Sequence, residues 1–354
     1  MREEWVRVVR RTIVAAALTA AGLWPAGAAA QEGATEMPAD DGAYCSATTA
    51  TVYDACLDGA RADYKLEVGK CLNVVLNQAR LNCLADAQGA RDEAIALCKA
   101  QRVVRHNVCA ALGEARYEPN FDPARFDQDL GNLTNPNPYF PLATGYRWEF
   151  EGSEHVTVVV LDKVKLIAGN HCFVANDRVI VDGIVVEDTD DWFAHAKSGD
   201  VWYAGELSRD FETFEGDVPP DPELITLEGS FKTRRDRAKP GIAFFRHPHK
   251  GKVYRQEYDL NNAEDMAEII STTYAFGDDP DLDRFVPQDL AELLCAGDCI
   301  VVREFTPLSP EDVERKYYAP GIGNFLGIHL DTGEKVQLVG CNFDTRCDKL
   351  PSPE

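Results

Sequence analysis

A proline-free segment with six regularly spaced cysteines constrains the fold more than any other feature of this 354-residue chain. The segment runs from Tyr44 to Tyr117, and its apolar residues recur at helical spacing. Its cysteines, separated by 10, 14, 11, 14 and 10 residues, are Cys45, Cys56, Cys71, Cys83, Cys98 and Cys109. Because steps of 11 and 15 residues are close to whole numbers of helical turns, neighbouring cysteines on one helix share a face. We therefore expect a helical module joined by disulfides.

Two disulfide arrangements fit this spacing. The spacing is symmetrical about its centre, which favours one antiparallel hairpin turning near Asn77 and resembles the twin-cysteine helical hairpins. That hairpin pairs Cys45 with Cys109, Cys56 with Cys98, and Cys71 with Cys83. A turn at Gly89 is the alternative, because glycine suits the end of a helix and Asp92 suits the start of the next. That arrangement pairs Cys83 with Cys98, Cys71 with Cys109, and Cys45 with Cys56, and the residues alone leave both open.

The first thirty residues have the three parts of a secretory signal peptide. Four arginines precede an apolar run of 13 residues, and small residues follow it, with Ala28 and Ala30 before Gln31. The run is too short for a membrane-spanning helix, and no later stretch is longer. We expect an exported, periplasmic or extracellular protein without a membrane span, in a compartment where disulfides persist.

Charge and composition divide the rest of the chain. The net charge of −23 argues against nonspecific binding to nucleic acid or to anionic lipid. Residues 118–138 contain four prolines and four asparagines, which is typical of a domain boundary. The expected parts are a signal peptide (1–30), a flexible lead-in (31–43), a helical module (44–117), a linker (118–138), an acidic β domain (139–340) and a C-terminal tail held by a disulfide (341–354).

From Tyr139 onward the sequence has the alternation and turn residues of short β-strands. Asp182-Gly183 and residues 197–200 each indicate a hairpin turn. Residues 288–294 are the one stretch that looks helical. The expected strands are 146–150, 155–161, 178–186, 192–195, 201–203, 224–231, 252–258, 267–274, 299–305, 314–318, 324–330 and 335–339. This pattern predicts an antiparallel β sandwich or open β-barrel, so the fold class is α+β in two domains.

Four blocks of this domain resemble a widespread family of secreted bacterial proteins without an assigned function. They are NPYFPLATGYRWEFEG (137–152), DTDDWFAHAKSGDVWYAGE (188–206), KPGIAFFRHPHKGKVYRQEY (239–258) and VERKYYAPGIGNFLGIHL (313–330). The likeness covers roughly residues 137–339. It implies an open β-barrel, similar to lipoprotein-like folds that hold apolar ligands, and an exported location. Residues 277–299 look like an insertion.

Five cysteines lie outside the helical module. Cys295 with Cys299, and Cys341 with Cys347, are expected to form local disulfides, whereas Cys172 is expected to be a buried, unreactive thiol.

Two groups of residues could bind a metal. His247 and His249 are spaced so that both rings of an extended chain point to one side, as a Cu or Zn site requires, although Arg246 and Lys250 flank them. An acidic loop offers the oxygen ligands that calcium prefers, at Asp278, Asp279, Asp281 and Asp283, but lacks the EF-hand pattern. An exposed turn and a solvated loop explain both groups more simply, so no cofactor is expected.

Catalytic motifs are absent from the sequence. Asp188, Asp190 and Asp191 could act as the paired carboxylates of a hydrolase beside Trp192. Aromatic residues of the expected strands could instead form a binding platform; those proposed are Trp192, Trp202, Tyr203, Tyr254 and Tyr258.

Three functions follow from these candidates. The favoured one is a secreted, non-catalytic protein that binds a small apolar or glycan ligand through its β domain, with the helical hairpin as a spacer or docking arm. An envelope protein is the other partner considered. A carboxylate hydrolase and a metal-binding exported protein are the alternatives.

Overall fold

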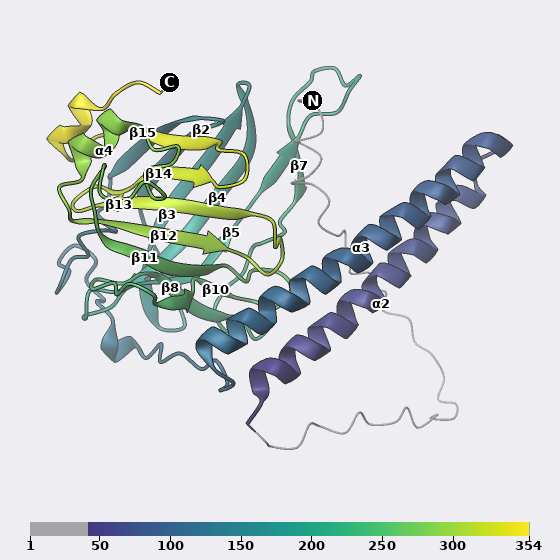
Figure 1. The fold of residues 1–354 in the computed structure, drawn as a ribbon, viewed down its shortest axis with the longest axis horizontal. Helices are drawn as coiled ribbons and strands as arrows, with labels where there is room; N and C mark the ends of the chain where they lie inside the picture. Colours follow the sequence, from purple (N-terminus) through teal and green to yellow (C-terminus); the bar gives the residue numbers. More distant parts are fainter. Residues whose placement is uncertain (1–41, 354) are drawn as a thin grey trace. The chain divides into compact units, whose positions relative to one another are not determined.

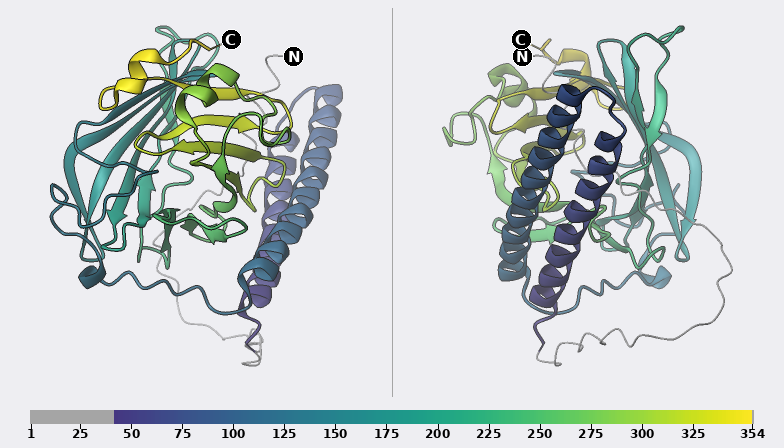
Figure 2. Two further views of the ribbon diagram at one scale, coloured as in Figure 1. Left: turned by 60° about the vertical axis from the view of Figure 1, so that its left-hand side comes forward. Right: turned by 90° about the vertical axis from the view of Figure 1, so that its right-hand side faces the viewer.

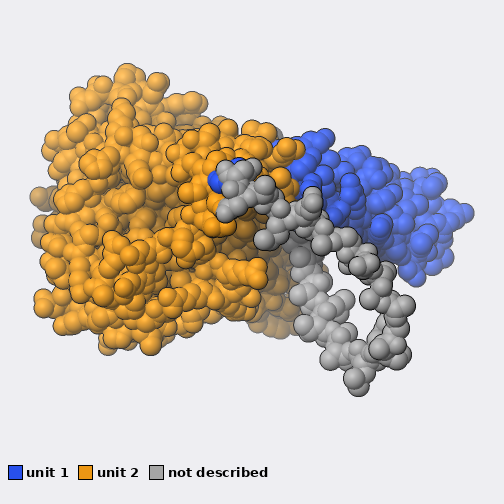
Figure 3. All heavy atoms as spheres, turned by 90° about the horizontal axis from the view of Figure 1, so that it is seen from below, with its two compact units in different colours: residues 1–43, 53–99 blue, residues 44–52, 100–354 orange. Residues whose placement is uncertain are grey.

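The structure is a computed structural model that describes residues 42–353. The expected signal peptide and residues 31–41 of the expected lead-in lie outside the described residues. The chain forms two compact units (Figure 3). One contains Tyr53–Lys99, and the other contains Tyr44–Val52 together with Ala100–Glu354.

Two long helices, α2 (Tyr44–Leu72) and α3 (Asn77–Leu112), carry the six clustered cysteines. The chain turns between them at residues 73–76, where the backbone N–H of Val74 donates to the carbonyl of Cys71 at 3.0 Å. The bridges are Cys45–Cys109, Cys56–Cys98 and Cys71–Cys83. The symmetrical hairpin is therefore confirmed. The arrangement that turns at Gly89 is wrong, because Gly89 lies inside α3, where a single glycine costs only about 1 kcal/mol.

The described part of the second unit contains one sheet of 15 strands (Figure 1). The strands are β1 (Arg147–Gly152), β2 (His155–Ile167), β3 (Asn170–Val181), β4 (Ile184–His195), β5 (Val201–Leu207), β6 (Asp210–Glu212), β7 (Glu223–Thr226), β8 (Lys239–Phe244), β9 (Val253–Arg255), β10 (Glu257–Tyr258), β11 (Met266–Tyr274), β12 (Cys299–Phe305), β13 (Val313–Ala319), β14 (Gly323–His329) and β15 (Lys335–Cys341). All paired neighbours are antiparallel.

The strand order is β10-β8-β5-β4-β3-β2-β1-β15-β14-β13-β12-β11-β9. The first strand of the chain, β1, pairs with the last strand, β15, and this pairing joins the two halves of the sheet. Figure 2 shows these halves facing each other. The two edges meet at residues 253–258, because β9 pairs with β11 and β10 pairs with β8, with only Gln256 between them. The result is a nearly closed antiparallel barrel.

Hydrophobic side chains fill one part of this barrel and cover its outer surface. Phe173, Phe193, Tyr317 and Phe325 belong to the largest buried cluster, which also includes residues of α4 (Gln288–Leu294). The local disulfides Cys295–Cys299 and Cys341–Cys347 are present, and the latter fixes η2 (Thr345–Lys349) against β15.

Part of the segment expected to be a linker packs on the sheet. Phe121 and Phe126, on either side of η1 (Pro123–Arg125), are buried against Cys172, Val174 and Trp192. Cys172 is a free, buried thiol. Phe121 and Phe126 therefore cover part of the outer face of β3 and β4.

The last three turns of α3 are anchored to the same unit. Arg105 donates two hydrogen bonds to Glu264, at 2.6 and 3.0 Å, and the two side chains expose only 6% and 2% of their surface. Gln101 Nε2 also donates to the carbonyl of Leu308 at 2.9 Å. A buried, bidentate ion pair fixes the position of this part of α3.

Most expected strands are confirmed, and two expected elements match without any shift: α4 and β12. The expectation for residues 224–231 is wrong beyond Thr226, and β6 and β8 are additional strands. No helix within residues 42–353 is long and apolar enough to cross a membrane.

Candidate functional site

The inner face of the barrel carries an unusual group of carboxyl side chains. Side chains alternate between the two faces of a strand, so Asp191 and Phe193 point inward from β4 while Trp192 points outward. Asp191 pairs with Glu206 across β4 and β5. The hydroxyl of Tyr203 hydrogen bonds to Oδ1 of Asp191 and lies 2.6 Å from Oε2 of Glu206. One tyrosine thus connects two carboxyl groups.

A bulge places Glu206 on this face. Tyr203 and Glu206 are three residues apart, so a regular strand would point them in opposite directions. The register shifts between Trp192 and Phe193, and β5 supplies the extra residue. At the bulge, Gly205 has φ +141°, and a Cβ there would lie 2.4 Å from the carbonyl oxygen of Phe231. Glycine is therefore required for this arrangement.

The geometry of this group sets the smallest number of acidic protons that it holds. Two short contacts between oxygens each need a hydrogen, but a tyrosine hydroxyl supplies only one. The second hydrogen must come from a carboxyl group, so Asp191 and Glu206 share at least one acidic proton when both contacts are made. This behaviour is typical of carboxyl pairs held close together.

Carboxyl groups from neighbouring and from facing strands extend this group. We call the whole set the interior acidic cluster; its members are Asp177, Glu187, Asp191, Glu206, Glu257, Asp265, Glu304 and Glu314. Lys316 on β13 points into it, and its Nζ lies 2.7 Å from Glu304 and 3.2 Å from Glu314. Gln256 Nε2 donates to Glu304 at 2.9 Å. Opposite walls of the barrel thus contribute to a single electrostatic site.

Burial and mutual repulsion shift these groups toward their protonated forms. Burial, followed by repulsion from Glu187 and Asp190, raises the pKa of Asp191 to about 7, although the Tyr203 hydrogen bond lowers it. Burial and then Asp191 raise the pKa of Glu206, and burial and then Asp265 raise the pKa of Glu257. A positive charge placed among these carboxyls would relieve the repulsion.

Solvent nevertheless reaches the cluster. The side chains of Lys316, Glu304 and Glu314 expose 28%, 14% and 26% of their surface, and Asp265 is exposed. Strands surround these groups, yet water is not excluded. Solvent therefore reaches part of the cluster and moderates the repulsion within it.

One buried hydroxyl near the cluster has no hydrogen-bond partner within the described residues. Tyr254 exposes 5% of its surface, and its hydroxyl is unpaired. Burial, followed by the negative charge of Glu304, raises the pKa of Tyr254, while Lys316 opposes this shift. The Oδ1 atom of Asp177 is also buried and unpaired. Unpaired buried polar atoms are uncommon and indicate positions that a ligand or water can satisfy.

The five aromatic residues expected to form a platform do not share one surface. Trp192 and Trp202 pack with Phe121 and Phe126 on the outer face of β4 and β5. Tyr203 lies on the inner face, where its ring stacks on Phe193 with 4.9 Å between centroids. Tyr254 lies in a different buried cluster, next to Phe245, and Tyr258 packs against Tyr117. Only Tyr203 and Tyr254 lie at the interior acidic cluster.

The structure also separates the three aspartates expected to act together. Arg209 holds Asp188 and Asp190, each at 3.0 Å, and Asn176 donates to both. Asp191, on the other face of the strand, joins Tyr203 and Glu206 instead. The expected grouping is corrected because adjacent strand residues alternate between faces.

No set of three or more His, Cys, Asp or Glu side chains within residues 42–353 is arranged to hold a metal ion. His247 and His249 are exposed in the loop between β8 and β9. In the acidic loop, Asp283 accepts hydrogen bonds from the Tyr274 hydroxyl and the Gly277 N–H, and Asp279 accepts from the Asp281 N–H. These aspartates stabilise the turn that contains them.

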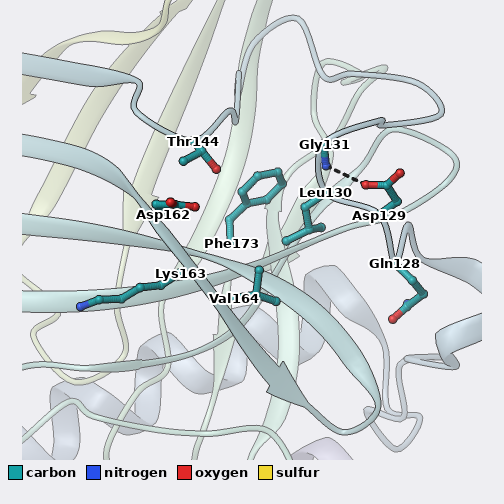
Figure 4. A pocket seen from close by; sticks show the side chains of 9 residues that line it. All are labelled: Gln128, Asp129, Leu130, Gly131, Thr144, Asp162, Lys163, Val164 and Phe173. Carbon is teal, nitrogen blue, oxygen red and sulfur yellow. Dashed lines mark hydrogen bonds between the residues drawn. The ribbon is translucent and has the colours of Figure 1, made fainter.

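A separate hollow of about 280 Å³ lies on the surface near β2 and β3 (Figure 4). The sheet register shifts between Val160 and Val164, and residues Asp162 and Lys163 of this irregular stretch border the hollow. Phe173 and Leu130 form part of its wall. The hollow has none of the shifted carboxyl groups of the interior acidic cluster, so it is the weaker candidate site.

No family model and no curated protein matches the chain. A search of solved structures finds a putative lipoprotein from Parabacteroides distasonis, with 13% identity and a TM-score of 0.29. The alignment covers 59% of this chain and all of that one. This similarity is too low to carry an argument about function.

Sequence reasoning missed most of the interior acidic cluster. It considered Asp191 and Tyr203, but assigned them to different sites, and it singled out neither Glu206 nor Lys316. The signal that was available is their position: Asp191, Tyr203 and Glu206 lie on either side of the hairpin turn expected at residues 197–200.

Proposed function

We propose that this protein is an exported, non-catalytic binding protein whose barrel takes up a small ligand rich in hydrogen-bond donors at the interior acidic cluster. The observation that carries the proposal is the Asp191–Tyr203–Glu206 group, which is solvent-accessible and surrounded by further carboxyls. The five disulfides of the described residues support an oxidising location outside the cytoplasm.

Of the two ligand classes that the sequence suggests, a glycan fits this site better than an apolar molecule. An apolar ligand would strip water from many carboxyl groups without replacing their hydrogen bonds, which costs free energy. Sugar hydroxyls can donate hydrogen bonds to Asp191 and Glu206.

The experiment is a thermal-shift screen of the full chain with maltotriose, an N-acetylglucosamine trimer, 1,4-diaminobutane and palmitate. We expect at least one hydrogen-bonding compound to raise the melting temperature by several degrees at saturation, and palmitate to have no effect. Tyr203→Phe should abolish the increase in melting temperature. Tyr146→Phe is the control and should not abolish it, because Tyr146 stacks on Phe343 away from the interior acidic cluster. Stabilisation by palmitate alone, or by none of the compounds, would overturn the proposal.

A further inference from the structure

We infer that the ligand is an organic cation, held by its ammonium group between the Asp191–Tyr203–Glu206 group and Glu257. This inference rests on the proposed function and narrows the ligand from any hydrogen-bond donor to an amine. It follows from the charge balance of the interior acidic cluster, from an ammonium group that the protein already holds there, and from the unpaired Tyr254 hydroxyl.

The charge of the cluster is unbalanced. The cluster has eight carboxyl side chains from both walls, and the cation that points among them is Lys316. Its ammonium group is bound to Glu304 and Glu314 on its own wall. Asp191, Glu206 and Glu257 on the opposite wall have no comparable ion pair within the described residues. A second positive charge is the missing complement of this wall.

Lys316 also shows how the barrel binds an ammonium group. Its Nζ contacts two carboxylates, Glu304 and Glu314, and the hydroxyl of Tyr318 contacts the same Glu304 at 3.4 Å. Asp191, Glu206 and Tyr203 repeat this combination of two carboxyls and one tyrosine on the facing wall.

An organic cation fits this arrangement better than a metal ion. A metal needs several ligands directed at one point, and no such set exists within residues 42–353. The carboxyls are instead distributed over β4, β5 and β10, which suits a larger cation with separated N–H groups.

Tyr254 supplies the independent observation. Its hydroxyl is buried, without a hydrogen-bond partner among the described residues, and under the influence of Glu304 and Lys316. A tyrosine hydroxyl can accept a hydrogen bond from an ammonium group, so an amine that reaches the Glu304 side of the cluster can satisfy this otherwise costly atom.

The experiment is isothermal titration of the full chain with 1,4-diaminobutane, 1,4-butanediol and calcium chloride. The diol has the same chain length as the diamine and lacks only its charge. We expect the diamine to bind at least about tenfold more tightly than the diol, and to bind more weakly as sodium chloride is added. Glu206→Gln should weaken binding of the diamine by about tenfold or more. Glu311→Gln, at an exposed position, should leave the affinity for the diamine unchanged.

The other outcomes separate this inference from the proposed function. Binding of the diol or of sugars without binding of the diamine would overturn the inference that the ligand is a cation. The proposed ligand site would still stand. Calcium binding that excludes the diamine would also overturn it. Absence of binding by every compound would overturn both proposals. Because Glu206→Gln could perturb folding, Tyr254→Phe serves as a second variant. A weaker affinity of this variant for the diamine, with an unchanged unfolding curve, supports the inference. An unchanged affinity for the diamine in both variants contradicts it.

Discussion

The hydroxyl of Tyr203 lies 2.6 Å from Oε2 of Glu206, although the two residues are three positions apart on one β-strand. A regular strand would place them on opposite faces. The bulge at Gly205 brings them to the same face and next to Asp191. A local irregularity of the backbone therefore creates the central part of the proposed site.

Gly205→Ala should disrupt this bulge. The added Cβ would lie 2.4 Å from the Phe231 carbonyl oxygen and 2.8 Å from the Cα of Lys232, and neither backbone atom can move easily. We expect a loss of about 2 kcal/mol or more in the free energy of unfolding, measured by urea denaturation. Gly183→Ala is the control, because Gly183 also has positive φ but an added Cβ there would have no atom within 4 Å. It should cost only about 1 kcal/mol, and equal losses in both variants would contradict the role given to Gly205.

Asp191→Asn should change how stability depends on pH. The pKa of Asp191 rises from 3.8 to about 7 on folding, so the folded state binds this proton more tightly than the unfolded state. Such a group contributes stability that is fully present below about pH 4 and is lost as the pH rises through about 7. The parent protein should therefore lose stability over this range, and the variant should lose less of it.

Urea denaturation at a series of pH values measures this difference. Asp221→Asn is the control, because Asp221 is exposed and lies outside the interior acidic cluster. It should not flatten the profile. Parallel profiles for the parent and Asp191→Asn would show that Asp191 does not hold its proton in the folded state.

Arg105→Met should strongly destabilise the unit that contains the barrel. It would leave Glu264 buried without its partner, which costs about 3–5 kcal/mol. Replacing both residues, as Arg105→Met with Glu264→Leu, should recover part of this loss because no charge stays buried. Arg61→Met removes an exposed ion pair with Asp58 and should cost less than about 1 kcal/mol. Equal effects of Arg105→Met and Arg61→Met in denaturation would refute the anchoring role of Arg105.

Cys172 should resist thiol reagents in the folded protein. Burial raises the pKa of its thiol to about 12, so very little reactive thiolate exists at neutral pH. Iodoacetamide should label the chain only after denaturation, giving one modified cysteine by mass spectrometry when the disulfides are kept intact. Rapid labelling of the native protein would contradict the buried state of this thiol.

The sequence predicted the secondary structure best where local pattern and tertiary context agree. Residues 288–294 and 299–305 have clear helical and strand patterns, and α4 and β12 have those limits. β8 was missed because it begins with Lys-Pro-Gly, and proline and glycine are unfavourable in strands. Gly241 is nevertheless required there, since a Cβ would lie 2.0 Å from the Gln256 carbonyl oxygen.

The disulfide pairing also shows that local sequence preferences alone do not determine the fold. Symmetry of the cysteine spacing indicated the observed hairpin, but Gly89 offered an equally plausible turn from local preferences alone. The packing of two long helices decides between these two turns, and the preference of a single residue does not predict that packing.

The interior acidic cluster was harder to predict for a specific reason. The expected hairpin at residues 197–200 fixes a register, and without a bulge that register would set Asp191 opposite Gly205. The observed bulge sets it opposite Glu206 instead. Glu257, Glu304 and Lys316 join the site only because the sheet closes on itself, which depends on pairing between distant strands.

Carbon-13 NMR of the side-chain carboxyl groups tests the central claim most directly. Titration of the full chain should give an apparent pKa near 7 for the Asp191 group in the absence of ligand. Saturation with 1,4-diaminobutane should lower that apparent pKa, because a bound ammonium group favours the charged carboxylate. An apparent pKa for Asp191 that stays the same with and without the diamine would contradict the account.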